Sequence, residues 1–371
     1  MPDGTTFVGL DVHVATIAVA AVRDDGIAQE LGVIPNTPGA LTKRLGKLGA
    51  PATLSICYEA GPCGYGIYRQ LTEAGMACAV VAPSLIPVRP GDRVKTDRRD
   101  AAKLARLLRS GELTPVAVPT PEQEALRALS RARETAARDL HRVRQRLLKF
   151  LAQQRITEPG SGKRWTKTYW TWITGLTRPL AASQIVLDEL RAAITTAQAQ
   201  LARVTAALTE VAQTSPQASV IAALQTLHGI GPITAVGIVA EVGDLTRFDR
   251  PPQLMAYAGL VASEHSSGGR QQRGGITRTG NSHLRYLLVE AAWQYARPIR
   301  LSPSPPPTPI DQIAQQARAR LQRRYFRLVS RGKPKQVAIV AVARELLGFI
   351  WAVAQATAVT HPAPVAEPRA A

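Results

Sequence analysis

The sequence predicts an α/β domain followed by a largely helical region. Over the first 85 residues, short apolar runs occur first in hairpins and then alternate with helical patterns, which is typical of a mixed sheet covered by helices. Over residues 121–155 and 181–212, apolar residues recur at helical spacing. With 371 residues, the chain is long enough for two or three domains, each with its own core.

The first three strands are expected in hairpins. Thr6–Val12 is an apolar run that ends near the acid Asp11, and Ala15–Val22 follows after a tight connection. Asp24-Asp25-Gly26 is a typical hairpin turn, so it predicts a third strand near Glu30–Ile34.

Helices and strands then alternate. Asn36 or Thr37 is expected to cap a helix that begins at Pro38, because proline is favoured in a first helical turn. The elements expected in this stretch are a helix over Pro38–Leu48, a strand over Ala52–Tyr58, a helix over Tyr65–Ala74 and a strand over Met76–Val81.

Four carboxylates are expected near one edge of this sheet. Asp11 and Glu59 each stand at the carboxyl end of an apolar strand, where ligands bind in open α/β sheets. Asp97 and Asp100 share one face of the first turn of a predicted helix, where helix capping explains one of them more easily than both. Because like charges raise each other's pKa, four converging acids favour one or two Mg²⁺ ions and phosphoryl-transfer chemistry.

Three motifs together resemble the DEDD transposases of the insertion-sequence-110 family. They are Gly9-Leu10-Asp11-Val12-His13, Tyr58-Glu59-Ala60-Gly61 and Lys95-Thr96-Asp97-Arg98-Arg99-Asp100-Ala101. The resemblance implies that residues 1–115 form a RuvC-like catalytic domain, a variant of the RNase H fold. It also implies that the metal-binding tetrad consists of Asp11, Glu59, Asp97 and Asp100.

Residues 116–218 are expected to form a helical, coiled-coil-like arm. Its two apolar stripes fit either an antiparallel hairpin within one chain or a dimer of two chains, and the sequence leaves both open. Between the stripes, residues 159–178 are expected to form a loop that carries Tyr169, Trp170 and Trp172. These aromatic residues beside basic ones can stack on bases, but a small packed core is the favoured interpretation.

Residues 219–300 are expected to form a second domain with a helix-hairpin-helix. Gly229 and Gly231 lie between two predicted helices, the second of which opens at Pro232. Glycines let the backbone approach a phosphate, and the next helix N-terminus offers free amides, so both glycines are candidates for nucleic-acid binding. The alternative, a packing turn, needs only one of the two glycines.

A polar loop over residues 261–280 is expected before a helix over Ser282–Ala296. This run resembles the serine-bearing C-terminal domain of the same family, and the likeness covers roughly residues 5–155 and 220–300. The resemblance implies that Ser267 is the nucleophile, with Ser266 as the alternative one residue away. Without it, the natural interpretation is a flexible Gly/Ser loop. Arg270 and Arg273 flank the serine and are expected to hold a phosphate, which also makes the neighbouring Arg278 a candidate.

Positive charge predicts a nucleic-acid partner. The chain has 46 Lys and Arg against 27 Asp and Glu, a net charge of +19. From His265 onward there are 16 Lys and Arg against 4 Asp and Glu, or +12, and Arg323 and Arg324 are candidates for phosphate contacts there. Residues 301–357 are expected to begin with a stiff proline-rich spacer at residues 302–309 and to continue with basic C-terminal helices over Gln312–Val329 and Gln336–Ala354. Residues 358–371 are expected to form a disordered tail.

The compartment is expected to be the bacterial cytoplasm, at the nucleoid. Three cysteines show no zinc-like spacing and one is left unpaired, which favours a reducing environment. The N-terminus lacks the pattern of a signal peptide, and no apolar run is expected to approach the membrane-spanning length of about 18 residues.

The predicted function is that of a DNA transposase or recombinase that cleaves and exchanges donor and target strands with Mg²⁺. The resemblance further implies a structured non-coding bridge RNA as guide, and a homo-oligomer, a dimer or a tetramer, is expected. Two alternatives stay open. A RuvC-like junction-resolving nuclease would hydrolyse DNA and need no serine, and a nucleic-acid-binding scaffold would have no use for four acids.

Overall fold

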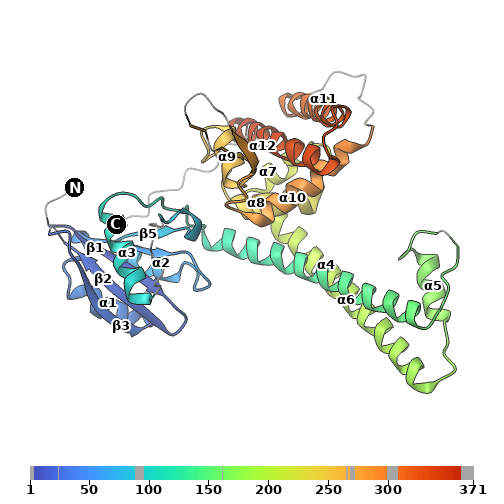
Figure 1. Cartoon of the computed structure of the whole chain (residues 1–371), viewed down its shortest axis with the longest axis horizontal. Helices are drawn as coiled ribbons and strands as arrows, with labels where there is room; N and C mark the ends of the chain where they lie inside the picture. The colour runs from blue at the N-terminus through green and yellow to red at the C-terminus, as the bar shows by residue number, and fades with distance from the viewer. Residues whose placement is uncertain are drawn as a thin grey trace. The chain divides into compact units, whose positions relative to one another are not determined.

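The computed structural model describes residues 4–23, 25–87, 96–160, 162–264, 266–267, 272–298 and 308–360, without the side chain of Arg273. The chain divides into two compact units, Met1–Pro119 and Thr120–Ala371 (Figure 1). The first unit holds a five-stranded sheet and the second is mainly helical, as the sequence predicts.

The sheet of the first unit is mixed, with the strand order β3-β2-β1-β4-β5. β1, β2 and β3 pair in antiparallel fashion, whereas β4 lies parallel to β1 and β5 parallel to β4. This arrangement is consistent with an RNase H-like domain. The strands are β1 (Thr6–Val12), β2 (Thr16–Val22), β3 (Ala28–Pro35), β4 (Leu54–Glu59) and β5 (Ala77–Val81).

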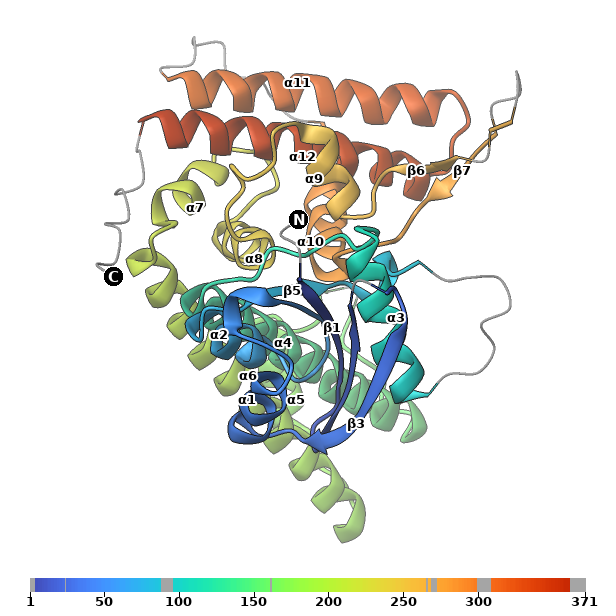
Figure 2. The same ribbon diagram turned by 90° about the vertical axis from the view of Figure 1, so that its left-hand side faces the viewer.

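Helices cover both faces of this sheet (Figure 2). α1 (Pro38–Gly46) and α2 (Gly66–Glu73) lie on one face over a core of aliphatic side chains, and α3 (Asp97–Arg109) covers the other. Thr37 is the N-cap of α1, because its hydroxyl accepts a hydrogen bond from the Ala40 amide. Asn36, the other predicted cap, instead donates to the His13 carbonyl oxygen.

Gly9 allows α3 to lie directly on the sheet. A Cβ atom at this position would collide with the Ala101 carbonyl oxygen and would come within 2.5 Å of the Ala105 amide nitrogen. Both atoms belong to the backbone of α3, which cannot move aside as a flexible side chain can. A glycine inside a strand often marks such a close approach of another backbone. Gly9 therefore sets the height of α3 above β1.

The second unit begins with two long helices that pack against each other in the same chain, α4 (Pro121–Gln153) and α6 (Ala181–Thr214). α5 (Lys167–Gly175) lies in the segment between them, so the loop predicted over 159–178 is partly helical. The packed core favoured for this segment is confirmed. Tyr169 and Ile173 are buried in it, and Trp165, Trp170 and Trp172 pack around them; we call this cluster the tip core.

The remaining helices share one core, which we call the helical core. A short hairpin of β6 (Ala262–Glu264) and β7 (Arg273–Ile276) extends from it, in place of the continuous loop predicted over 261–280. These strands are too short and polar to show a strand pattern in the sequence. The helices are α7 (Ala218–Leu224), α8 (Pro232–Val242), α9 (Pro251–Tyr257), α10 (Ser282–Ala292) with the 3₁₀ turn η3 (Trp293–Ala296), α11 (Pro309–Ser330) and α12 (Lys335–Thr360).

α12 corrects two expectations. By length and composition it is apolar enough to cross a membrane, so the prediction that no apolar run approaches that length was wrong. Half of its most apolar 18-residue stretch is buried inside the chain, where the helix packs against α7, α9, α10 and α11. A helix that is covered on several sides is apolar around its circumference. It also continues to Thr360, past the predicted start of the tail, while residues 302–307 and 361–371 lie outside the described residues.

A buried carboxylate joins α4, α8 and α10 inside the second unit. Glu241 is 2% exposed, and its two oxygens accept hydrogen bonds from Arg131 at 2.8 and 2.9 Å. The Asn281 amide donates to the same carboxylate at 2.7 Å. Burial alone would raise the pKa of Glu241, but these hydrogen bonds and the charges of Arg131 and Arg127 outweigh burial and lower it.

Replacing Arg131 by Ala is expected to lower the free energy of unfolding of the second unit by about 3–5 kcal/mol, because a buried carboxylate loses its cation. Urea unfolding at neutral pH measures this loss. The matched control is Arg142→Ala, which removes an exposed pair with Asp139 and is expected to cost less than about 1 kcal/mol. Equal losses of unfolding free energy in the two variants would contradict the stabilising role of the Arg131–Glu241 pair.

The stabilisation by Glu241 is also expected to depend on pH. Because the folded pKa lies below the unfolded one, this stabilisation is fully present above the unfolded glutamate pKa of about 4.3. It is lost as the pH falls further, through the folded pKa. In Glu241→Gln this part of the acid destabilisation should be absent.

Candidate active site

The sheet register places Asp11 and Glu59 side by side. β1 and β4 pair in parallel up to Leu10 and Tyr58, and the two acids are the next residue on each strand. Because side chains alternate between faces, both acids share the face that α3 covers. Cys57 marks this face, since its thiol donates to the Leu104 carbonyl oxygen of α3 at 3.6 Å.

Asp97 and Asp100 stand in the first turn of α3. Neither is the N-cap, because the hydroxyl of Thr96 accepts the capping hydrogen bond from the Arg99 amide at 3.4 Å. Thr96 is therefore the N-cap, and side-chain capping does not account for the acid pair. Asp97 is 60% exposed, whereas the Oδ2 atom of Asp100 is shielded from solvent.

The structure brings three possible metal ligands together from β1, the turn that follows it and α3. His13 Nε2 lies 3.5 Å from Asp11 Oδ2 and 3.6 Å from Asp97 Oδ2, and one ligand atom from each residue lies within 4.8 Å of the others. Within the described part of the chain, Glu59 and Asp100 do not belong to this group. The acid cluster is therefore able to bind a metal ion through at least Asp11 and Asp97.

His13 was missed by the sequence analysis, although it ends the motif that carries Asp11. Its backbone is fixed on both sides. The His13 amide donates to the Thr16 carbonyl oxygen at 2.8 Å, and the Asn36 amide group donates to the His13 carbonyl oxygen at 2.8 Å. A histidine two residues after a strand-end aspartate, in a tight turn, was the signal available in the sequence.

The donor atoms of this group fit a divalent cation. Carboxylate oxygens are the ligands that Mg²⁺ and Mn²⁺ prefer, and imidazole nitrogen is accepted better by softer transition metals. The basic residues Arg93 and Lys95, which precede the acid pair, lie outside the described residues.

Ser266 and Ser267 are both exposed at the hairpin formed by β6 and β7, which we call the serine hairpin. The Ser266 hydroxyl donates to Glu264 Oε1 at 2.7 Å, so a carboxylate already holds the alternative serine. Arg270 and the side chain of Arg273, both predicted to hold a phosphate, lie outside what the structure describes.

The root of the serine hairpin is tightly packed. Gly259 and Gly280 both have positive φ, and a Cβ atom at either would collide with the backbone of the opposite segment, at Thr279 and Tyr257 respectively. Arg285 also stabilises the root of the hairpin, because its guanidinium donates to the Ala258 carbonyl oxygen at 2.8 Å. The hairpin is therefore carried on a fixed base. Arg278, another candidate for phosphate binding, lies at this root, exposed and with a φ of 56°.

The two glycines between α7 and α8 differ in their surroundings. Gly229 has a φ of 86°, and a Cβ there would lie 2.5 Å from the Ala291 carbonyl oxygen, so this glycine is required for packing. Around Gly231, the N-cap of α8, a Cβ would meet no atom within 4 Å. Packing accounts for Gly229 but not for Gly231.

The two arginines predicted on the C-terminal helices also differ. Arg323 is exposed on α11. Arg324 is half-buried, and its Nε lies 3.2 Å from Glu345 Oε1 on α12, next to the pair that Arg320 makes with the same carboxylate. Of the two, Arg323 has the more accessible guanidinium.

Family models match both regions that carry these residues. Residues 8–155 match the model of DEDD transposases of the IS110 type, and residues 221–301 match a model described as "Transposase IS116/IS110/IS902 family". The first match contains Asp11, Glu59, Asp97 and Asp100, and the second contains Ser267.

Relatives that match most of the chain are transposases too. The putative transposase y4qE of Sinorhizobium fredii is 41% identical over 94% of this chain and 88% of its own length. The transposase for insertion sequence element IS1533 of Leptospira borgpetersenii is 29% identical over 88% of this chain and 97% of its own length. The transposase for IS1111A of Coxiella burnetii is 26% identical over 70% of this chain and 71% of its own length. Transposases cleave DNA and transfer its strands, and this chain belongs to the IS110 family of transposases.

Proposed function

We propose that this transposase cleaves and rejoins DNA with Mg²⁺ held by Asp11, Glu59, Asp97 and Asp100 and with Ser267 as nucleophile. The observation that carries the metal site is the convergence of Asp11, His13 and Asp97, with their ligand atoms within 4.8 Å of one another. Glu59 joins them because it follows β4 in register with Asp11, and Asp100 because it stands one turn after Asp97.

The metal site supplies the charge that phosphoryl transfer needs. Mg²⁺ held by these carboxylates would polarise a phosphoryl oxygen and favour deprotonation of an oxygen nucleophile. The residues of this chain contribute its placement. Gly9 sets α3 on the sheet, and Asn36 fixes the turn that carries His13.

The serine separates recombination from hydrolysis. Strand exchange must conserve the energy of the broken phosphodiester, and a covalent ester between enzyme and DNA does so. The Ser267 hydroxyl loses its proton as its oxygen forms a bond to phosphorus. The bond from phosphorus to the leaving DNA oxygen breaks, that oxygen takes up a proton, and a DNA hydroxyl later reverses the step. The exposure of Ser267 in a hairpin whose root is fixed supports this role, whereas the Ser266 hydroxyl is engaged with Glu264.

The same proposal includes the nucleic-acid partners. We assign donor and target DNA contacts to Gly231, Arg278, Arg323 and the hairpin arginines Arg270 and Arg273, supported by the exposure of the first three. Gly229 and Gly231 with α7 and α8 would serve as a helix-hairpin-helix on backbone phosphates. A structured bridge RNA would supply sequence specificity by base pairing, and the arm of α4 and α6 would support a dimer or tetramer. The chain would work at the nucleoid in the bacterial cytoplasm.

Trapping the covalent intermediate tests this proposal. A suicide substrate that loses its leaving strand should leave DNA attached to the parent chain, and peptide mapping should find it on Ser267. Ser267→Ala should abolish the adduct, and Ser266→Ala should retain it. An adduct that is lost only in Ser266→Ala would move the nucleophile to Ser266. Strand exchange without any adduct would show that the serine mechanism is wrong.

A further inference from the structure

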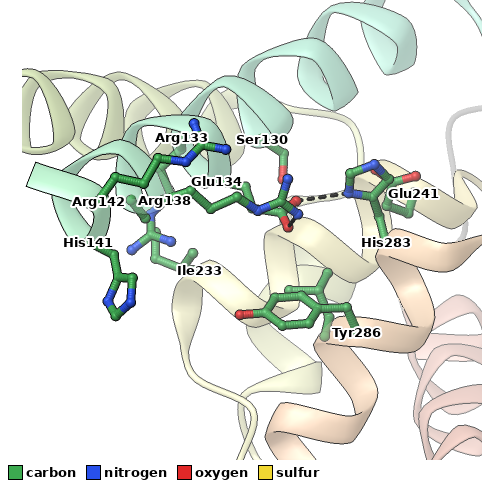
Figure 3. Close-up of a pocket in the computed structure, with 12 residues that line it drawn as sticks. Ser130, Arg133, Glu134, Arg138, His141, Arg142, Ile233, Glu241, His283 and Tyr286 are labelled. Carbon is green, nitrogen blue, oxygen red and sulfur yellow. Dashed lines mark hydrogen bonds and ion pairs between the residues drawn. The ribbon is translucent and has the colours of Figure 1, made fainter. Parts of the chain in front are cut away.

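A pocket of about 490 Å³ opens in the second unit between α4, α8 and α10 (Figure 3). Its volume lies in the range of pockets that enclose small organic ligands, which suits a single nucleotide. Its lining contains no residue of the serine hairpin, and the function proposed above makes no use of it.

One part of the pocket wall is aromatic and apolar. Tyr286 of α10 is 51% exposed, and Leu287 and Ile233 line the pocket with it. A half-exposed tyrosine beside aliphatic side chains presents a flat apolar ring whose hydroxyl still reaches water. Such a ring is a platform for a base, because every base has a π face and stacks without regard to sequence.

The opposite part of the wall is basic and comes from α4. Three arginines line it, Arg133, Arg138 and Arg142. They belong to a strongly basic stretch, since residues 127–149 contain eight Lys and Arg against two Asp and Glu. In Figure 3 these arginines lie on the α4 side of the pocket and Tyr286 on the α10 side.

The acids of the pocket already have internal partners. Glu134 pairs with Arg138, and Glu134 Oε2 lies 2.8 Å from His283 Nδ1. The second acid is Glu241, whose partners are described above. Among the described residues, Arg142 pairs with Asp139 on the helix surface, a contact worth at most about 1 kcal/mol. Its guanidinium can therefore turn to a phosphate, which arginine binds in a forked geometry.

We propose that this pocket binds one unpaired nucleotide of a single-stranded segment, with its base against Tyr286 and an adjoining phosphate on Arg142 of α4. A base has to be unpaired to enter, because a duplex buries its faces in the stack. DNA and RNA share this chemistry, so either can supply the nucleotide. The proposal rests on the nucleic-acid binding proposed above, but it requires neither the tetrad nor Ser267.

Fluorescence anisotropy with the full-length chain tests it, using labelled oligothymidine, labelled oligouridine and a blunt DNA duplex of equal length. Tyr286→Ala should weaken binding of the single strands about tenfold and leave duplex binding unchanged. Tyr286→Phe should bind like the parent. Arg142→Gln should reduce by about 0.7 the slope with which the logarithm of the single-strand binding constant falls against the logarithm of the salt concentration. The matched control Arg203→Gln, which changes an exposed arginine on α6, should leave this slope unchanged.

Each outcome decides the proposal. If Tyr286→Ala weakens binding of oligothymidine alone, the pocket takes DNA, and if it weakens binding of oligouridine alone, the pocket takes RNA. Either result supports the proposal. The proposal is overturned if Tyr286→Ala binds single strands like the parent, or if it loses as much affinity for the duplex as for the single strands. It is also overturned if the parent chain binds neither single strand. Because Tyr286 is half-exposed, unchanged thermal unfolding in Tyr286→Ala is expected and is checked alongside. The Ser267 adduct test is independent, so the two proposals can fail separately.

Discussion

Asp97→Asn is expected to lower DNA cleavage by on the order of a thousandfold or more while nucleic-acid binding is kept, because a metal ligand is lost and the phosphate contacts remain. Cleavage of a labelled donor end measures the first quantity and gel shift the second. Binding should be equal to that of the parent or tighter, since a negative charge is removed beside the phosphates.

A readout other than activity separates the metal site from other roles of Asp97. Mn²⁺ or Mg²⁺ should raise the thermal stability of the parent chain, because a ligand that binds only the folded state stabilises it. This gain should disappear in Asp97→Asn. The matched control is Asp188→Asn, which changes an exposed aspartate on α6. Full cleavage and a full metal response in Asp97→Asn would remove Asp97 from the site.

Gly9→Ala is expected to destabilise the first unit by about 3 kcal/mol or more and to abolish cleavage. The added Cβ would meet the Ala101 carbonyl oxygen, so α3 must lift from β1 and carry Asp97 away from Asp11. Hydrogen exchange measures the local loss, which should be confined to the strands and α3 of the first unit. Amides of the helical core should exchange as in the parent.

Gly39→Ala is the matched control, because a Cβ at Gly39 of α1 meets no atom within 4 Å. Alanine replaces glycine in a helix there, so this change should be neutral or stabilise by up to about 1 kcal/mol. If Gly9→Ala behaves like Gly39→Ala, α3 is not seated on the sheet through Gly9.

Much of the first unit could be predicted because its elements carry local signals. Apolar runs predicted four of the five strands and a hairpin turn predicted the third, and Gly26 in that turn has a φ of 73°. The placement of Asp11 and Glu59 followed from a general rule about strand ends. The loop predicted around Tyr169 proved partly helical, because its helix is short and its aromatic side chains pack in three dimensions rather than in a periodic stripe.

What could not be predicted depends on contacts between segments distant in sequence. His13 meets Asp97 only because α3 crosses the sheet at β1, and nothing local encodes that crossing except Gly9. The hydrogen bonds of Glu241 likewise join Arg131 and Asn281 from distant segments. The apolar length of α12 was missed because Arg344 and Glu345 interrupt the apolar residues of this helix in the sequence.

The continuity of α4 gives the second unit a mechanical property. Leu126 belongs to the helical core and Leu151 to the tip core, and the helix between them contains neither glycine nor proline. At 1.5 Å per residue the two leucines are about 38 Å apart, so a rotation of about ten degrees at the root would swing the tip through about 7 Å. α4 thus has the shape of a stiff lever, and Arg131 near its root binds Glu241. Glu241 also accepts a hydrogen bond from Asn281, whose backbone amide donates to the Tyr257 carbonyl oxygen at the root of the serine hairpin.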